Sequence, residues 1–145
     1  MNEKSDAAMC VDEIEASVYA QLKPLGFRKY GRTLHRFVSG DLSQIIHFQC
    51  GLPSVGPTQQ MLVNLGIRIP ECDERTFSPS PLKRYYHEYN CTLRSRLGSI
   101  DGRQELCFDL QKRPSRLLKQ ILPDVLTKVM PVYNALSSRE AILAH

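Results

Sequence analysis

Two stretches of alternating polarity between Asp41 and Ile69 constrain the fold of this 145-residue chain more than any other feature. In the second stretch every other residue is apolar: Met61, Val63, Leu65, Ile67 and Ile69. The residues between them are Leu62, Asn64, Gly66 and Arg68. Successive side chains of a strand point to opposite faces, so this pattern predicts a half-buried β-strand. The first stretch alternates in the same way, with Ile46, Phe48 and Cys50 set against Ile45, His47 and Gln49. We therefore expect two adjacent strands with one apolar face and one polar face.

The segments on either side complete a pattern of one helix, then strands, then helices. Apolar residues at helical spacing predict a helix over about residues 5–25, which Pro24 and Gly26 end. Further strands are expected at 33–38, 90–97 and 105–110, with tight hairpin connections at Ser39-Gly40-Asp41 and Asp101-Gly102. After Pro114 a wide apolar stripe predicts helix, which Pro123 and Pro131 should each kink or restart. Ser137 with Glu140 is a capping-box pattern and predicts a short last helix.

Helices and strands are thus segregated along the chain rather than alternating. This favours an α+β fold: an N-terminal helix, an antiparallel sheet of about five strands, and C-terminal helices packed on one face. The length fits a single domain over residues 1–145, with 1–6 and 140–145 expected to fray.

Composition places the chain among ordinary globular proteins, with 42% apolar and 23% charged residues and a net charge of +4. Neither a secretory signal nor an apolar run long enough for a membrane span is found, so we expect a soluble, cytoplasmic protein without membrane contact. Five widely spaced cysteines fit neither a disulfide framework nor a zinc site, and no metal or cofactor is expected. Cys72, in a polar loop, is the cysteine expected to be most exposed.

Several stretches resemble a bacterial family of domains of unknown function, number 4304. They are LKPLGFRKYGRTLHRF, SQIIHFQCG, MLVNLGIRIPEC and YNCTLRSRLG, which together span roughly two-thirds of the chain. The most characteristic pieces are Gly26-Phe27 with Arg32, Phe48-Gln49, Asn64-Leu65-Gly66 and the run from Arg94 to Gly98. The resemblance implies a compact cytoplasmic module. Some small families of this kind are suspected immunity proteins against bacterial toxins, and the resemblance implies no catalytic residues.

The polar face of the expected sheet is the first candidate site. If the strands pair in sequence order, one surface collects Arg36, His47, Gln49, Asn64, Arg68, Arg94 and Arg96. Guanidinium and amide groups on a rigid sheet suit the recognition of carboxylate or phosphate, because they form paired, charge-assisted hydrogen bonds. The alternative is an ordinary solvated face of an antiparallel sheet.

The loop from Lys83 to Tyr89 is the second candidate site. Its basic and aromatic residues could contact a protein partner or stack on bases, and the anchors would be Arg84, Tyr85, Tyr86 and Tyr89. The alternative is that one or two of these tyrosines close the edge of the core while the cations are solvated. No RNA-binding signature accompanies the loop, so nucleic acid is a less favoured partner.

An enzyme is the remaining class of function. The four histidines are scattered and no catalytic motif is present, so no catalytic residue is assigned. A Cys–His pair such as Cys50 or Cys72 with His47 stays open, because spacing along the chain does not show which side chains meet.

These observations favour a small binding module, with an immunity protein that neutralises a cognate toxin by stoichiometric contact as the leading hypothesis. The basic balance suits an acidic or nucleotide-handling partner. Binding of a small anion or nucleic acid through the arginine face is the first alternative, and an uncharacterised enzyme is the second. The sequence determines neither the partner, nor the strand order, nor the oligomeric state.

Overall fold

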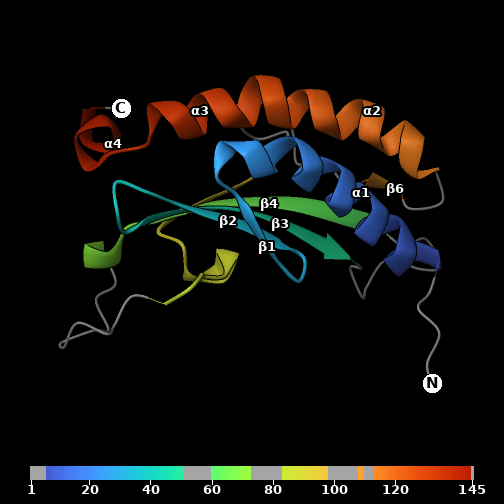
Figure 1. Ribbon diagram of the computed structural model, residues 1–145, viewed down its shortest axis with the longest axis horizontal. Coiled ribbons are helices and arrows are strands. Elements are labelled where there is room, and N and C mark those ends of the chain that lie inside the picture. Colours follow the sequence, from blue (N-terminus) through green and yellow to red (C-terminus); the bar gives the residue numbers. More distant parts are fainter. Residues whose placement is uncertain (1–5, 51–59, 73–82, 98–107, 110–112, 145) are drawn as a thin grey trace.

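The computed structural model describes residues 6–50, 60–72, 83–97, 108–109 and 113–144. Figure 1 shows a curved sheet with helices on one face and the segment 83–91 against the other. The helical elements are α1 (Asp6–Leu22), η1 (Lys23–Leu25), η2 (Pro70–Cys72), η3 (Glu88–Asn90), α2 (Pro114–Asp124), η5 (Val125–Val129), α3 (Met130–Ala135) and α4 (Arg139–Ala144). The strands are β1 (Arg28–Tyr30), β2 (Thr33–Val38), β3 (Leu42–Cys50), β4 (Gln60–Arg68), β5 (Leu93–Arg96) and β6 (Phe108–Asp109).

Within these ranges the strands form one antiparallel sheet in the order β1-β2-β3-β4-β5, with β6 also paired to β4. The α+β fold expected from the sequence is confirmed, including the helices on one face of an antiparallel sheet. The prediction did not include β1, whose three residues are too few to show a period. Gly31, with φ of +58°, makes the turn from β1 into β2.

Both β5 and β6 pair with the same edge of β4. Arg96 lies opposite Asn64 in β4, and Phe108 lies opposite Met61. The described part of the expected fifth strand thus continues the edge that β5 begins. The expected Asp101-Gly102 turn lies outside the described residues.

The apolar face of the sheet forms the main core with the helices. Met61, Val63, Leu65 and Ile67 of β4 are all buried there, as the alternating pattern predicts. The helices contribute residues at helical spacing: Val11, Ile14, Val18 and Leu22 from α1, and Leu117, Ile121, Val125 and Val129 from the C-terminal helices. Burial of these apolar side chains is the main force that holds the helical layer on the sheet.

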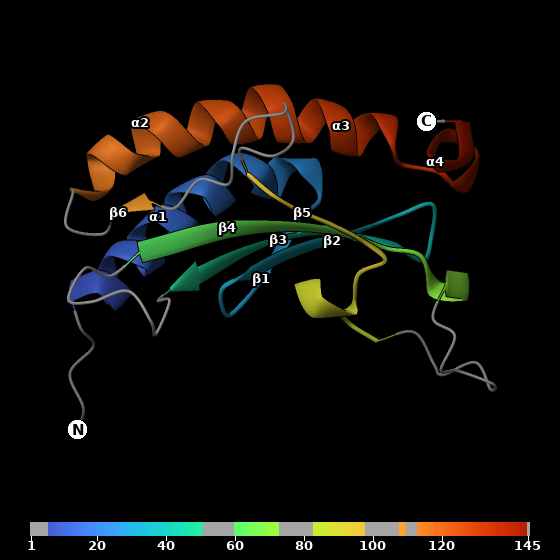
Figure 2. The same ribbon diagram turned by 180° about the vertical axis from the view of Figure 1, so that it is seen from behind.

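The C-terminal helix runs from Pro114 to Ala135 through both internal prolines, and Figure 2 shows it as one gentle arc. A π-helical segment, Val125–Val129, lies between Pro123 and Pro131. In this segment the backbone N–H of Met130 bonds to the carbonyl oxygen of Val125, five residues earlier, so the helix continues as a wider π turn between the two prolines. Neither proline ends the helix, although each lacks an amide hydrogen. The last helix also differs from expectation at its start: Ser138, rather than Ser137, accepts a hydrogen bond from the backbone N–H of Ala141 at 3.1 Å.

Tyr133 of α3 attaches the helical layer to the two central strands by hydrogen bonds. Its hydroxyl donates to the carbonyl oxygen of Ile45 at 2.6 Å and accepts from the backbone N–H of Gly66 at 3.0 Å. The ring is 3% exposed, and burial raises the pKa of the hydroxyl well above its ordinary value. One phenol therefore fixes the position of α3 over β3 and β4.

Removing this hydroxyl should destabilise the fold without changing its shape. We expect Tyr133→Phe to lower the free energy of unfolding by about 1–3 kcal/mol, because the buried carbonyl of Ile45 and N–H of Gly66 lose a partner. Urea denaturation followed by circular dichroism measures the change. Tyr19→Phe, at a partly exposed position of α1, is the matched control, and equal losses for the two variants would contradict the assigned role of Tyr133.

Glu15 is a buried acid on α1 with little to compensate its charge. It is 0% exposed, and neither of its carboxylate oxygens has a hydrogen-bond partner. The nearest cation is the ammonium group of Lys29 on β1, 3.6 Å from Oε1. Burial raises the pKa of Glu15 to about 7, and Lys29 only partly opposes the shift.

The raised pKa predicts a pH dependence of stability with a defined sign. The folded protein holds the Glu15 proton more tightly than the unfolded chain, whose value is near 4.5, so stability should fall as pH rises from about 4.5 to about 7. Glu15→Gln removes the charge and should stabilise the protein at pH 8 by about 2 kcal/mol, with little effect at pH 4.5.

Urea denaturation at the two pH values measures this difference. Glu13→Gln, at an exposed position of the same helix, is the matched control for the loss of one negative charge. A Glu15→Gln effect of the same size at both pH values would show that the carboxyl group is not protonated on folding.

Candidate functional site

The strand register brings four of the predicted polar-face residues together. Asn64 of β4 lies opposite His47 of β3 on one side and Arg96 of β5 on the other, and Gln49 is two residues along from His47. Residues directly opposite in neighbouring strands point to the same face of a sheet. These side chains therefore meet on the face that the helices leave uncovered.

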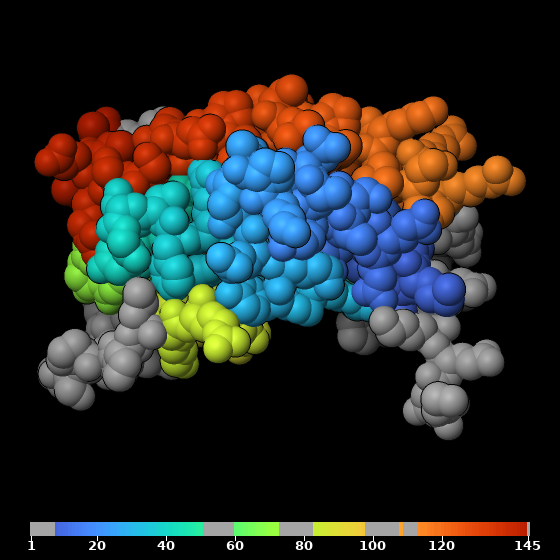
Figure 3. All heavy atoms as spheres, viewed as in Figure 1, coloured from blue at the N-terminus to red at the C-terminus, as the bar shows by residue number. Residues whose placement is uncertain are grey.

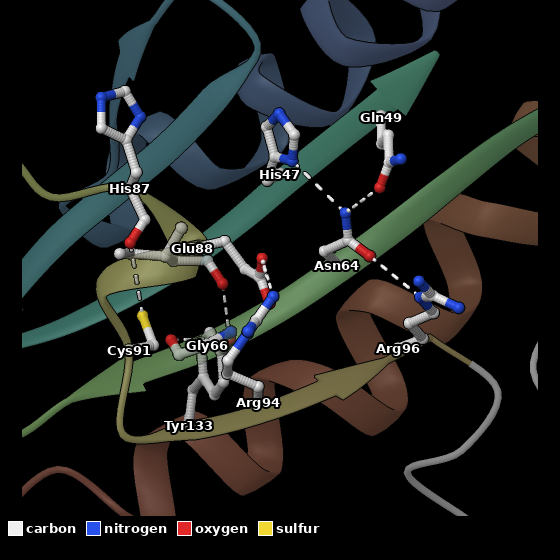
Figure 4. A network of polar contacts seen from close by, with 11 residues as sticks. His47, Gln49, Asn64, Gly66, His87, Glu88, Cys91, Arg94, Arg96 and Tyr133 are labelled. Carbon is white, nitrogen blue, oxygen red and sulfur yellow. Dashed lines mark hydrogen bonds and ion pairs between the residues drawn. The ribbon is translucent and has the colours of Figure 1, made fainter. Parts of the chain in front are cut away.

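Asn64 is the centre of this polar group, as Figure 4 shows. Nε of Arg96 donates to the side-chain oxygen of Asn64 at 3.2 Å. The amide nitrogen of Asn64 lies 2.9 Å from Oε1 of Gln49 and 3.3 Å from Nδ1 of His47. With Asn64 only 5% exposed, the network holds the imidazole and the second amide in fixed orientations.

The other arginines of the predicted face are engaged with neighbouring side chains. Arg94 forms a two-pronged ion pair with Glu88 of η3, with nitrogen–oxygen distances of 2.7 and 3.0 Å. The guanidinium of Arg68 lies over the ring of Tyr86, 3.8 Å from its centre. These two side chains attach the segment 83–91 to the sheet. Fewer of their N–H groups are therefore available to bind an anion.

Arg36 does not share the polar face, so the prediction that placed it there is wrong. It lies opposite Gln44 and points to the helix side, where it donates to Gln44, to the carbonyl of Leu25 and to Asn134. Its guanidinium also lies over the ring of Phe27, 4.9 Å from the ring centre. The sequence of β2 does not show which face Arg36 occupies, because His35 and Arg36 place a basic side chain on each face of the strand.

A second, smaller core lies under the segment 83–91. It contains Ile45, Tyr86 and Cys91, with Phe37 packed against it. Tyr86 is 7% exposed and its hydroxyl accepts from the backbone N–H of Lys83 at 3.0 Å. Tyr86 was expected among the exposed anchors of a partner, and this expectation is wrong because its ring closes the core on this face.

Gly66 allows this segment to approach β4. A Cβ at position 66 would lie 2.5 Å from Sγ and 2.8 Å from Cβ of Cys91, closer than such atoms can pack. Only glycine therefore fits beneath the turn at η3. This requirement gives a physical reason for a glycine in the Asn64-Leu65-Gly66 motif.

The turn at η3 and the polar face together enclose a recess of about 200 Å³. Its lining consists of His47, Gln49, Asn64, His87, Glu88 and Tyr89. Burial lowers the pKa of His47, although the carboxylate of Glu88 opposes the shift. A neutral, oriented imidazole thus lies in the recess beside two amides and a carboxylate.

Four aromatic rings run from the β1 edge to this recess, and we call them the aromatic row. Tyr30 stacks on Tyr85 with ring centres 4.2 Å apart, Tyr85 meets His87 edge-on at 5.3 Å, and His87 stacks on Tyr89 at 4.9 Å. Tyr89 is 67% exposed at the end of the row. Sequence reasoning identified Tyr85 and Tyr89 but missed Tyr30, whose only signal was its place before a glycine turn.

At the other end of the row, the β1 edge carries a basic hollow of about 460 Å³. It is lined by Tyr19, Arg28, Lys29, Tyr30 and Arg84. Figure 3 shows this edge between α1 above and the segment 83–97 below. Of the predicted anchors, Arg84 lines the hollow, Tyr85 stacks on Tyr30 of the hollow, and Tyr89 lines the recess.

Among the described residues no hydrogen bond joins a cysteine thiol to a histidine ring, and the thiol of Cys91 reaches only the backbone carbonyl of His87. Cys50 lies in the same strand as His47 but points to the opposite face. His35 and Ser43 are 2.9 Å apart, but both are buried under the segment 83–91. Burial raises the pKa of the Cys91 thiol to about 12, and Cys72 is exposed as expected. Among the described residues no cluster of three potential metal ligands occurs.

None of the described helices has the length and apolar character that crossing a membrane requires. Comparison with curated proteins and with solved structures yields no match. The sequence profile of one family, described as a domain of unknown function (DUF4304), matches residues 18–135. This span includes both candidate surfaces and most of the core. The chain therefore belongs to the DUF4304 family of domains of unknown function.

Proposed function

We propose that this protein is a binding module whose basic hollow and aromatic row dock an acidic surface of a protein partner. We further propose that the partner is a bacterial toxin, which the module neutralises by stoichiometric contact in the cytoplasm. The observation that carries the proposal is the stack of Tyr30 on Tyr85 beside three cations, Arg28, Lys29 and Arg84.

Rings that are already stacked suit an interface, because little side-chain freedom is lost when a partner covers them. Tyrosine and arginine are the residue types that most often dominate binding energy at protein interfaces. Tyr85 is anchored from both sides, by Tyr30 at 4.2 Å and by His87 at 5.3 Å. This preorganisation favours a specific protein contact over a merely solvated loop.

The charge of the hollow favours an acidic partner. Arg28, Lys29 and Arg84 are exposed, and Lys29 lies 3.6 Å from the buried carboxylate of Glu15. Complementary charge at the rim of an interface raises the association rate and selects among partners. A toxin with an acidic rim around its active site would meet these requirements.

Binding of an anion by the whole arginine face has less support. Arg36 lies on the other face, Arg94 is paired with Glu88, and Arg68 lies over Tyr86. An anion would have to compete with these contacts.

Two substitutions, one in the aromatic row and one in the hollow, should weaken partner binding. We expect Tyr85→Ala and Arg84→Glu each to weaken binding at least about tenfold, because one removes the central ring and the other reverses the charge beside it. The partner is first captured from host cells with the tagged protein, then purified. Isothermal titration calorimetry with the purified partner should give one-to-one stoichiometry. The association rate constant, measured separately, should fall as the salt concentration rises.

Arg116→Glu, at an exposed position of α2, is the matched control for charge reversal and should bind as the unchanged protein does. Co-expression separates the toxin hypothesis from binding alone: the unchanged protein should protect cells that express the partner, and Tyr85→Ala should not. A partner that binds the Arg84→Glu and Arg116→Glu variants equally well would contradict docking at the hollow.

A further inference from the structure

Arg96 determines which donor and acceptor atoms of the neighbouring side chains face the recess. A guanidinium group only donates, so the atom of Asn64 that lies 3.2 Å from Nε of Arg96 is the carbonyl oxygen. The amide nitrogen of Asn64 therefore faces His47 and Gln49, and it donates to Nδ1 of the first and Oε1 of the second. The arginine thus determines which ends of three other polar side chains remain available.

Two N–H donors follow from this arrangement. His47 is neutral at pH 7, because burial lowers its pKa, and its Nδ1 accepts, so the ring proton resides on Nε2. The side-chain oxygen of Gln49 accepts from Asn64, so its NH₂ group remains able to donate to a ligand. Within the described residues neither Nε2 of His47 nor Nε2 of Gln49 has a hydrogen-bond partner. The floor of the recess therefore offers donors to an incoming molecule.

The walls offer a carboxylate and an aromatic surface. Arg94 holds Glu88 through both carboxylate oxygens, at 2.7 and 3.0 Å, and each oxygen retains a further accepting position. The Glu88 side chain is 11% exposed, so its orientation is restricted. His87 and Tyr89 stack at 4.9 Å with planes 13° apart, so each ring covers one face of the other and a further flat ring could extend the stack. A matching ligand has acceptor atoms, an amino group and a flat ring.

The volume of the recess limits the size of the ligand that it can hold. The recess measures about 200 Å³, below the roughly 300–1,000 Å³ typical of sites for larger ligands. It accommodates a single ring and excludes most of a nucleotide. Aromatic side chains bind bases by stacking, and a glutamate carboxylate pairs with the amino group of cytosine.

We propose that this recess binds a cytosine-type base, a pyrimidine that carries an amino group next to ring acceptors. The donors of His47 and Gln49 meet its ring nitrogen and carbonyl oxygen, the amino group donates to Glu88, and the ring stacks against Tyr89. Uracil places a carbonyl oxygen where cytosine has the amino group, and the carboxylate of Glu88 repels it. The inference does not rest on the protein partner proposed above. The recess shares His87 and Tyr89 with the aromatic row, but its polar groups, on His47, Gln49 and Glu88, are not part of the row or of the hollow.

Titration of the full chain with cytidine and with uridine tests the proposal. Nucleosides are used because they lack the phosphate, which basic residues would attract regardless of the base. We expect saturable binding of cytidine with a Kd of about 1 mM or tighter, and uridine at least about tenfold weaker. Nitrogen-15 NMR should show the ring signals of His47 and the side-chain NH₂ signals of Gln49 shifting along the same binding curve.

Gln49→Glu is the decisive variant, because it replaces the NH₂ donor by an acceptor and keeps the shape and the oxygen that Asn64 contacts. We expect it to weaken cytidine binding at least about tenfold. Gln120→Glu, at an exposed position of α2, makes the same change in charge away from the recess and should leave affinity unaltered. Glu88→Gln, which keeps an oxygen for Arg94, should reduce the preference for cytidine over uridine.

Three results would overturn the assignment: equal affinity for the two nucleosides, a Gln49→Glu variant that binds cytidine normally, or no saturation up to about 10 mM. Titration with cytidine monophosphate is a further control. If it binds while cytidine does not, and Gln49→Glu has no effect on it, attraction of phosphate by surface cations is the explanation and the base site is rejected.

Discussion

The close approach of three layers at Gly66 is the constraint on which the rest of the structure depends. On the helix side its backbone N–H reaches the hydroxyl of Tyr133, which also bonds to Ile45. On the opposite face Cys91 occupies the space that a side chain at position 66 would need. A strand normally separates what lies on its two faces. Here a missing side chain allows α3 and the η3 turn to be fixed against the same point of β4, and η3 then forms one wall of the recess.

This arrangement explains why the polar face is not simply solvated. An arginine-rich sheet face would repel itself if its charges were left uncompensated. The chain folds its own segment 83–91 onto the face instead, so Arg94 pairs with Glu88 and Arg68 covers Tyr86. Most of the positive charge is thereby used to hold this segment. What remains accessible is narrower and more specific: an amide and imidazole floor on one side, and the basic hollow at the β1 edge on the other.

The sequence was informative wherever one strand or helix determined the outcome. Alternation in β4 predicted which of its faces packs against the helices, and helical spacing predicted the buried positions of α1. The strand was expected to be half-buried, and this is wrong because its other face is buried as well. The sequence was less informative where two distant segments meet. Tyr86 could be an anchor or a core residue until the segment 83–91 was seen to cover Ile45. Arg36 was misplaced because a basic residue on the helix side is stabilised by Asn134, 98 positions away, a contact that no local pattern reveals.

The aromatic row forms a continuous line of ring contacts between the two candidate sites. Tyr85 contacts Tyr30 of the hollow and His87 of the recess, so a movement of the Tyr85 ring affects both neighbours. His87 is in turn one residue from Glu88, whose carboxylate is tied to Arg94 on β5. Coupling between sites requires an element with two arrangements that each ligand favours differently. In the described chain the segment 83–91 reaches both sites, because Arg84 lines the hollow while Glu88 and Tyr89 line the recess. The sheet beneath this segment is held by Gly66 and Tyr133. Any communication between the hollow and the recess would therefore pass through the position of this segment rather than through the core.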